Sequence, residues 1–175
     1  MDWYTSIFEL IDMRSFSNLW YWIVLAVVWS TASHWVLGVP YDMITRARRN
    51  GGQAEDDLQA MVRINVNRLL YIARVSGVWL TGFTFFLLSG LIVLGFVFSV
   101  EFAQAVFLIA LPMSMVAWLS VATAVRIENE APEGAALRKR LLRHRLYTKM
   151  IGTLAIFVTA VWGMYVNMTA GVLGG

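Results

Sequence analysis

The chain has 175 residues, of which 59% are hydrophobic and 14% are charged, and its formal net charge at pH 7 is +3. A soluble domain averages about 25% charged residues, and the apolar excess here lies in blocks, which is typical of a membrane protein. The sequence has no cysteine, which excludes disulfides, thiol catalysis, and zinc or iron–sulfur sites held by cysteines of this chain.

The N-terminal stretch "DWYTSIFELIDM", residues 2–13, predicts a short helix that lies on the membrane surface. Its acidic residues fall mostly on one side of the helix, and the other side carries apolar residues that would enter the interface: Trp3, Ile7, Leu10 and Ile11. The alternative is that this helix docks onto a membrane-spanning helix of a partner.

Four apolar blocks reach the length of roughly 20 residues that crosses a hydrocarbon core of about 30 Å. The predicted spans are 18–39, 75–98, 102–124 and 150–171. The first is not a signal peptide, because its apolar run is too long and the residues before it are net acidic. The sequence therefore predicts an all-α integral membrane protein, a four-helix bundle with helical extensions.

Thirteen of the fourteen Lys and Arg residues lie in two connecting segments, 40–74 and 125–149, which hold six and seven of them. By the positive-inside rule, both segments face the cytoplasm, and both termini face the periplasm of a bacterial inner membrane. Acidic residues after "NGG" indicate a helix start, and no breaker follows, so we expect one helix from about Asp56 to Phe98. The turn "ENEAPEG" precedes a second such helix.

The densest basic stretch is "LRKRLLRHRLYTKM", residues 137–150. We interpret the basic residues of both segments first as a topology signal and then as contacts for anionic lipid headgroups or protein partners, at about 1 kcal/mol for each residue near the membrane surface. Nucleic acid is not an expected partner, because no aromatic platform accompanies the charge. The candidate contact residues are Arg46, Arg48, Arg49, Arg138, Lys139, Arg140, Arg143 and Arg145.

Small residues predict where the helices approach one another, because lipid gives helices no hydrophobic reason to associate. In the last span, such residues recur every four positions, and in the third span alanines recur every seven, as in a heptad seam. The predicted packing positions are Ala155, Thr159, Gly163 and Asn167, followed by Gly171, in the last span, and Ala103, Ala110, Ala117 and Ala124 in the third.

His34 is the one ionisable residue that falls inside a predicted span. Two interpretations stay open: a hydrogen bond between helices, or axial ligation of a haem or chlorophyll-type pigment. No second histidine lies within a span, so we expect no cofactor. The sequence also lacks a nucleophile elbow, a phosphate-binding glycine loop and a pair of histidines at metal spacing. We therefore expect no catalytic or metal site and no enzyme activity.

One resemblance rests on the runs "FELIDMRSFSNLWYWI" and "SHWVLGVPYDMITRARR", which lie within residues 8–49. This part of the chain resembles small multi-pass membrane proteins of photosynthetic and marine alphaproteobacteria that are labelled "component of SufBCD complex". The resemblance implies association with the cytosolic iron–sulfur assembly scaffold. It carries no catalytic motif, so it assigns no functional residue.

Two functions follow as hypotheses. The first is a non-catalytic accessory or scaffold protein of the bacterial inner membrane, which presents basic helical loops to cytoplasmic partners or anionic lipids. The alternative is an oligomeric channel or transport component with a pore lined by Ser, Thr and Asn. A haem or pigment protein acting through His34 is a lesser alternative. The expected partners are membrane lipids and either other membrane or cytoplasmic proteins or further copies of this chain.

Overall fold

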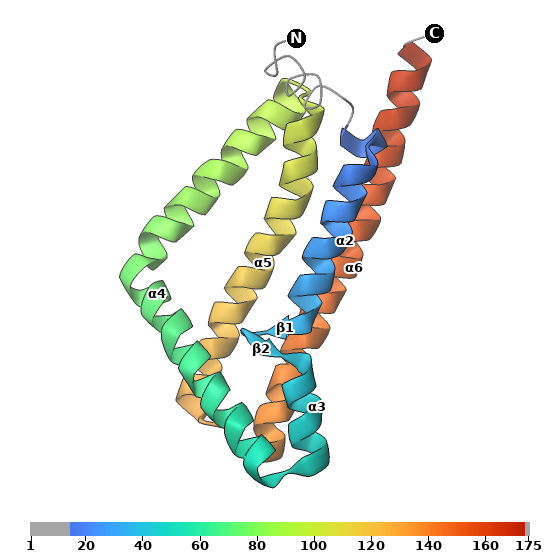
Figure 1. Ribbon diagram of the computed structural model, residues 1–175. Coiled ribbons are helices and arrows are strands. Elements are labelled where there is room, and N and C mark those ends of the chain that lie inside the picture. The colour runs from blue at the N-terminus through green and yellow to red at the C-terminus, as the bar shows by residue number, and fades with distance from the viewer. Residues whose placement is uncertain (1–14, 174–175) are drawn as a thin grey trace, which may run out of the picture.

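The computed structural model describes residues 15–173 of the chain, and the predicted interfacial helix 2–13 lies outside them. The described part is almost wholly helical (Figure 1). Its elements in chain order are the 3-10 turn η1 (Ser15–Ser17), α2 (Leu19–His34), β1 (Trp35–Val36), β2 (Val39–Pro40), α3 (Tyr41–Asn50), α4 (Gly52–Ile92), the π-helical turn η2 (Val93–Val97), α5 (Glu101–Glu130) and α6 (Gly134–Leu173).

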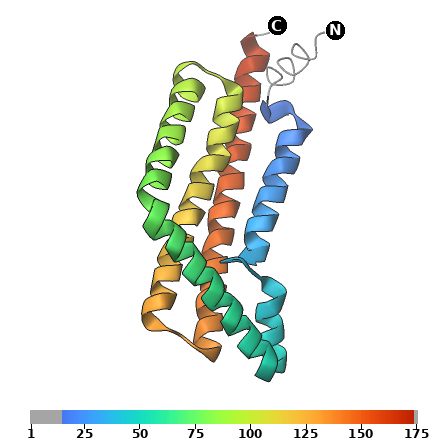
Figure 2. The same ribbon diagram turned by 60° about the vertical axis from the view of Figure 1, so that its left-hand side comes forward.

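The long helices run along one another between two ends of the molecule. Helix α2 lies along α6, and α5 packs against both α4 and α6 (Figures 1 and 2). The turn η1, the end of α6 and the turn between η2 and α5 lie at one end, which we call the terminal end. The α3–α4 and α5–α6 turns lie at the opposite end, which we call the module end.

Three of the described helices are long and apolar enough to cross a membrane, judged by length and composition. They comprise Gly52–Val97, Glu101–Glu130 and Gly134–Gly171. The all-α prediction is therefore confirmed, and α4 with η2 forms the predicted continuous helix. It starts at Gly52, a few residues earlier than the sequence indicated.

The first predicted span, 18–39, is wrong in its extent. Helix α2 has only 16 residues and ends at His34, which gives it a length of about 24 Å, short of the roughly 20 residues usual for a span. The following run "WVLGVP" is apolar, so hydropathy alone counts it into the helix. The structure instead folds it into a small hairpin.

The hairpin β1–β2 reverses the chain through a two-residue turn. Trp35 pairs with Pro40 and Val36 with Val39, antiparallel. The two turn residues, Leu37 and Gly38, both have positive φ, at 52° and 75°. Two positive φ values in succession are the geometry of tight hairpin turns, and glycine adopts it without strain. Val36, Leu37 and Val39 are buried because they belong to a core at the module end, whereas Trp35 is exposed.

That core lies in the segments that the sequence placed between the spans. It joins the hairpin, α3, the first half of α4, the end of α5 and the start of α6, which together we call the module. Its helix residues repeat at intervals of three or four, as an amphipathic helix requires. The buried residues are Val36, Leu37, Val39, Ile44, Ala47, Leu58, Val62, Val66, Leu70, Ala124, Ile127, Leu137 and Leu141.

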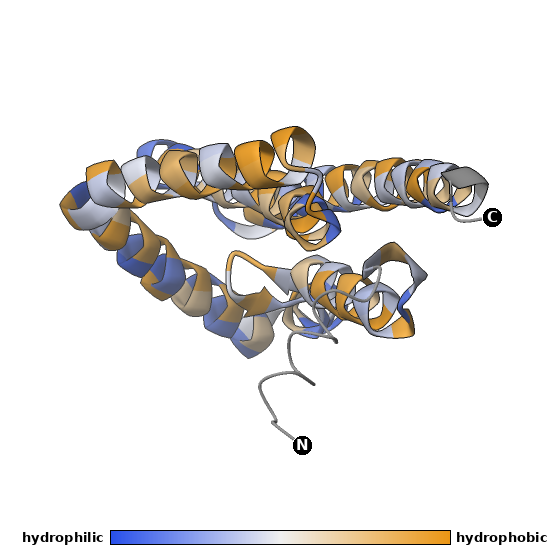
Figure 3. Ribbon diagram, turned by 90° about the horizontal axis from the view of Figure 1, so that it is seen from above, coloured by the Kyte–Doolittle hydropathy of each residue, from blue (hydrophilic) through white to orange (hydrophobic). Residues whose placement is uncertain are grey.

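Beyond the module, the burial pattern is reversed. Large apolar side chains of α4 are turned outward, and Val78, Trp79 and Phe86 are 87%, 83% and 77% exposed. Figure 3 shows hydrophobic residues, in orange, along each of the long helices. In this part of the described chain, Leu25 and Trp29 of α2 and Ala155 of α6 form a small core, and Ile109 and Met113 of α5 pack against it.

Candidate functional site

Three contacts link the helices at the level where the module meets the apolar segments. Arg145 of α6 donates from Nε to the Ser33 carbonyl at 2.9 Å, and its guanidinium lies 3.7 Å from the centre of the Tyr41 ring. Ser33 belongs to the last turn of α2, where carbonyls lack partners within the helix. Arg145 therefore satisfies the end of α2 and holds the start of α3 against α6.

Replacing Arg145 with lysine should lower stability although the charge is kept. Lysine lacks the planar guanidinium that stacks on Tyr41 while also donating to Ser33, and a cation–π contact of this kind is worth about 1 kcal/mol. The measurement is the thermal unfolding midpoint in mild detergent. The matched control is Arg143→Lys, because Arg143 is exposed on the same helix. Equal midpoints for the two variants would contradict a stabilising role for the stack.

The second contact joins α5 and α6 through a buried histidine. His144 is 5% exposed, and its Nδ1 lies 3.2 Å from Oγ1 of Thr123, within hydrogen-bond distance. Burial penalises the charged imidazolium and lowers the pKa of His144 to about 4. At neutral pH this histidine is uncharged and acts as a packing and hydrogen-bonding group of the module.

The third contact is an ion pair across α4 and α5. Arg74 Nη2 lies 2.5 Å from Glu128 Oε2, and both side chains retain access to solvent. Two further ion pairs lie deeper in the module, Arg138 with Glu55 and Arg140 with Glu130. The Arg138–Glu55 pair is half-buried and ties the start of α6 to the first turn of α4.

The candidate lipid or partner contacts fall into two groups. Three of them, Arg138, Arg140 and Arg145, have partners within the chain and support the module. The others have exposed side chains, on α3 and on the outer side of α6: Arg46, Arg48, Arg49, Lys139 and Arg143. We call these exposed basic side chains together the basic surface.

Residues at the boundary between the module and the apolar segments were not among the predicted contacts. Arg74, Arg126 and Lys149 are exposed and directly flank the apolar segments of α4, α5 and α6. Exposed aromatic residues occupy the same level, among them Tyr71 and Tyr147. The usable sequence signal was position, because each of these three residues stands directly beside one end of an apolar block.

His34 is the last residue of α2, and its side chain is exposed. Its ring meets Trp35 edge to face, with 5.7 Å between the ring centres. Among the described residues, no group of three or more His, Cys, Asp or Glu side chains is arranged to hold a metal ion. The histidine that packs between helices is His144, which the sequence placed in a connecting segment.

The predicted small-residue positions of α6 lie along its contact with η1 and α2. Ala155 and Thr159 are buried, and a Cβ at Gly163 would lie 3.3 Å from Phe16. Asn167 accepts a hydrogen bond from the Ser17 hydroxyl at 2.8 Å. Gly171, at the end of this series, is exposed.

The predicted alanine seam of α5 is closed at its ends and open in between. Ala103 and Ala124 are 4% and 0% exposed, Ala110 is half-buried, and Ala117 is exposed in the single chain. The seam faces α4, because Ala124 shares a core with α4 residues and Glu128, one turn further, pairs with Arg74.

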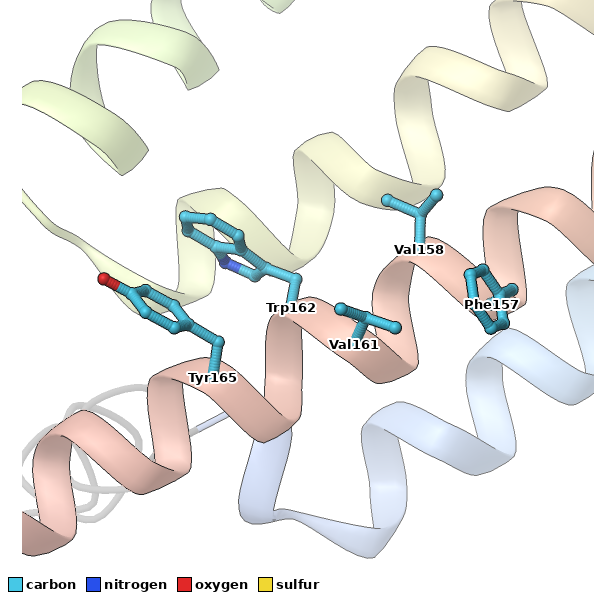
Figure 4. A pocket seen from close by; sticks show the side chains of 5 residues that line it. All are labelled: Phe157, Val158, Val161, Trp162 and Tyr165. Atoms are coloured by element: carbon cyan, nitrogen blue, oxygen red, sulfur yellow. The ribbon is translucent and has the colours of Figure 1, made fainter.

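A shallow pocket of about 360 Å³ lies on α6 near the terminal end. Figure 4 shows its lining, Phe157, Val158, Val161, Trp162 and Tyr165, which all come from one helix. The indole of Trp162 donates to Oε1 of Gln104 at 3.0 Å, and Gln104 donates to the Gly95 carbonyl at 2.7 Å. The pocket is almost entirely apolar, so it offers contact area rather than acid–base chemistry.

Comparisons of the chain with protein-family models, curated proteins and solved structures found no match.

Proposed function

We propose that this chain is a multi-pass protein of the bacterial inner membrane that serves as a non-catalytic scaffold and presents its module to the cytoplasm. The observation that carries the proposal is the reversed burial. A soluble protein buries its most apolar segments, because exposed apolar patches of this size promote association. Here the apolar segments of α4, α5 and α6 are exposed, and the core lies in the segments of lower hydropathy between them.

A bilayer accounts for this arrangement. Side chains such as Val78, Trp79 and Trp118, which are all more than three-quarters exposed, would contact lipid tails at little cost. Helix α2 serves as the fourth crossing in this proposal, since it lies along α6 over the same level and is flanked by Trp20 and Trp35. A short helix can cross by local thinning of the bilayer or through flanking interfacial residues.

The charge distribution supports the orientation. The basic residues of the described part lie in the module and at its boundary, so the positive-inside rule places the module in the cytoplasm and both termini in the periplasm. The basic surface then faces the cytosol rather than the lipid, because α3 extends about 15 Å beyond the boundary. Its expected partner is an acidic surface of a cytoplasmic protein. The resemblance noted above makes the iron–sulfur assembly scaffold the first partner to test.

The absence of cysteine allows a clean test of this topology. Single cysteines at Arg48 and Lys139 should be protected from a membrane-impermeant maleimide in intact cells, whereas cysteines at Val100 and Gly175 should react after the outer membrane is permeabilised. Extraction with alkaline carbonate should leave the protein in the membrane fraction. A protected Gly175→Cys, or a protein released by carbonate, would contradict the proposal.

A second experiment separates the scaffold from the channel. The scaffold should retain a cytoplasmic partner in mild detergent, and reversing the charges of Arg46, Arg48 and Arg49 to glutamate should release it. The control reverses Arg126, which lies at the boundary rather than on the basic surface. A channel would instead form stable oligomers of this chain alone, with ion flux in liposomes that the triple reversal leaves intact.

A further inference from the structure

We propose that the space between α4 and α5 holds one acyl chain of an anionic phospholipid from the cytoplasmic leaflet, with its headgroup at Arg74. This inference rests on the proposed membrane insertion and adds a specific ligand to it. The two helices pack together at both ends of their apolar segments. Between these ends α4 bends away from α5 (Figures 1 and 2).

The separation is evident from burial on α4. Leu70 and Leu88 are buried, whereas no residue between them is buried. Gly77 lies seven residues after Leu70 and eleven before Leu88, which is close to two and three helical turns, so all three share the face toward α5. A Cβ at Gly77 would meet no atom within 4 Å. On α5, Ala117 of the alanine seam, which faces α4, is exposed.

Both ends of this opening are closed. On the module side, Leu70 and Ala124 belong to one core. On the terminal side, Gly95 packs so closely on α5 that a Cβ there would lie 3.0 Å from the Gln104 backbone nitrogen. From Gly77 to Leu88 the opening is therefore about 16 Å long, open sideways to the bilayer and closed above and below.

Three other occupants fit this shape poorly. A helix about 10 Å wide that spans the bilayer cannot enter an opening closed at both ends. Water needs polar partners, but the Thr84 and Ser114 hydroxyls already donate to carbonyls of their own helices. An empty space would forfeit the dispersion contacts of its walls. A lipid chain is thin, flexible, apolar and present at this depth, so it satisfies each constraint.

The headgroup position follows from charge. Arg74 precedes the apolar segment of α4 and stands at the module end of the opening, where it pairs with Glu128. Arg126 is also exposed at this level. A phosphate here can share the Arg74 guanidinium, which offers more donors than one carboxylate uses. The site therefore favours an anionic lipid over a zwitterionic one.

Native mass spectrometry of the delipidated full chain tests the site, with dipalmitoyl phosphatidylglycerol and dipalmitoyl phosphatidylcholine as probes. We expect each chain to bind one phosphatidylglycerol tightly and to bind phosphatidylcholine more weakly. Gly77→Phe should abolish this binding, because the ring fills the opening. Gly82→Phe is the matched control: Gly82 is also helical with open space around it, but it lies 140° around α4, toward bulk lipid, so binding should persist.

Two charge variants provide an independent measurement. Arg74→Gln should lower the affinity for phosphatidylglycerol about fivefold, the equivalent of ~1 kcal/mol for one basic residue near the membrane surface. It should leave the affinity for phosphatidylcholine unchanged. Glu128→Gln should tighten phosphatidylglycerol, because it frees the guanidinium.

The site is disproved if the wild-type chain retains no stoichiometric lipid, if both glycine variants bind alike, or if Gly77→Phe abolishes a dimer instead of a lipid. It is also disproved if neither charge variant shifts phosphatidylglycerol affinity. None of these outcomes concerns carbonate extraction, which tests membrane insertion separately.

Discussion

Replacing Gly152 with leucine should prevent α2 from packing against α6. A Cβ at Gly152 would lie 2.7 Å from Cε3 of Trp29, which is shorter than any ordinary contact. Trp29 cannot move aside easily, because it is 4% exposed and belongs to the core with Leu25 and Ala155. Overpacking of a filled core costs about 1–3 kcal/mol for added methylenes. Because leucine adds four heavy atoms at the closest point of the interface, we expect a destabilisation at the upper end of this range or above it.

The measurement is the yield of monodisperse protein in detergent together with its thermal unfolding midpoint. Gly82→Leu is the control, because a side chain there meets no atom within 4 Å. Gly163→Leu should fall between the two, since its Cβ would lie 3.3 Å from Phe16, and Phe157→Leu on the exposed side should be nearly neutral. If Gly152→Leu and Gly82→Leu unfold alike, α2 does not contact α6 at this level.

Hydropathy and helical periodicity predicted the three long apolar helices, because both depend only on local sequence. They overextended the first span because the apolar run "WVLGVP" has the hydropathy of a span but the turn chemistry of a hairpin. Gly38 before Val39 and Pro40 was the available signal. Whether Val36 and Val39 contact lipid or a protein core depends on the distant residues of α4 and α6 that cover them, and no local pattern contains that information.

The contacts at the boundary were only partly predictable for the same reason. Gly152 lies three residues before Ala155, on the predicted packing face of α6, so the four-residue repeat omitted a position that a three-residue step would have included. The partners of Arg145 and His144 are different: Ser33 and Thr123 lie 112 and 21 residues away in the chain. The sequence singled out His34 because it falls inside a predicted span. The histidine that is buried in the structure is His144, on α6.

Acidification from pH 7 to pH 4.5 should destabilise the protein through His144. Burial lowers its pKa to about 4, whereas an unfolded chain has a histidine pKa near 6.5. Between these values the unfolded state holds a proton that the folded state does not, so stability falls as the pH falls through this window. At 1.36 kcal/mol for each pKa unit, the loss at pH 4.5 is about 2 kcal/mol.

Thermal unfolding in detergent at a series of pH values measures this effect. The informative quantity is the difference from His144→Gln, because every contribution that the two proteins share cancels in it. That variant keeps a polar side chain but cannot take up the proton, and its profile should be flatter between pH 6.5 and 4.5. His34→Gln, with an exposed ring, should match the wild type. A His144→Gln profile parallel to the wild type would contradict the assignment.

The position of His144 also determines where acid should act first. Its contact with Thr123 joins α5 to α6 at the base of the apolar segments, and Leu141 and Leu137, one and two turns further, belong to the module core. A charged imidazolium there must gain water, which in the proposed membrane orientation comes from the module side. Hydrogen exchange at pH 4.5 should therefore rise first in residues 137–149 of α6, while residues 152–163, which pack on α2, keep their protection. If residues 137–149 and 152–163 lose their exchange protection at the same time, the module and the apolar segments unfold as one unit.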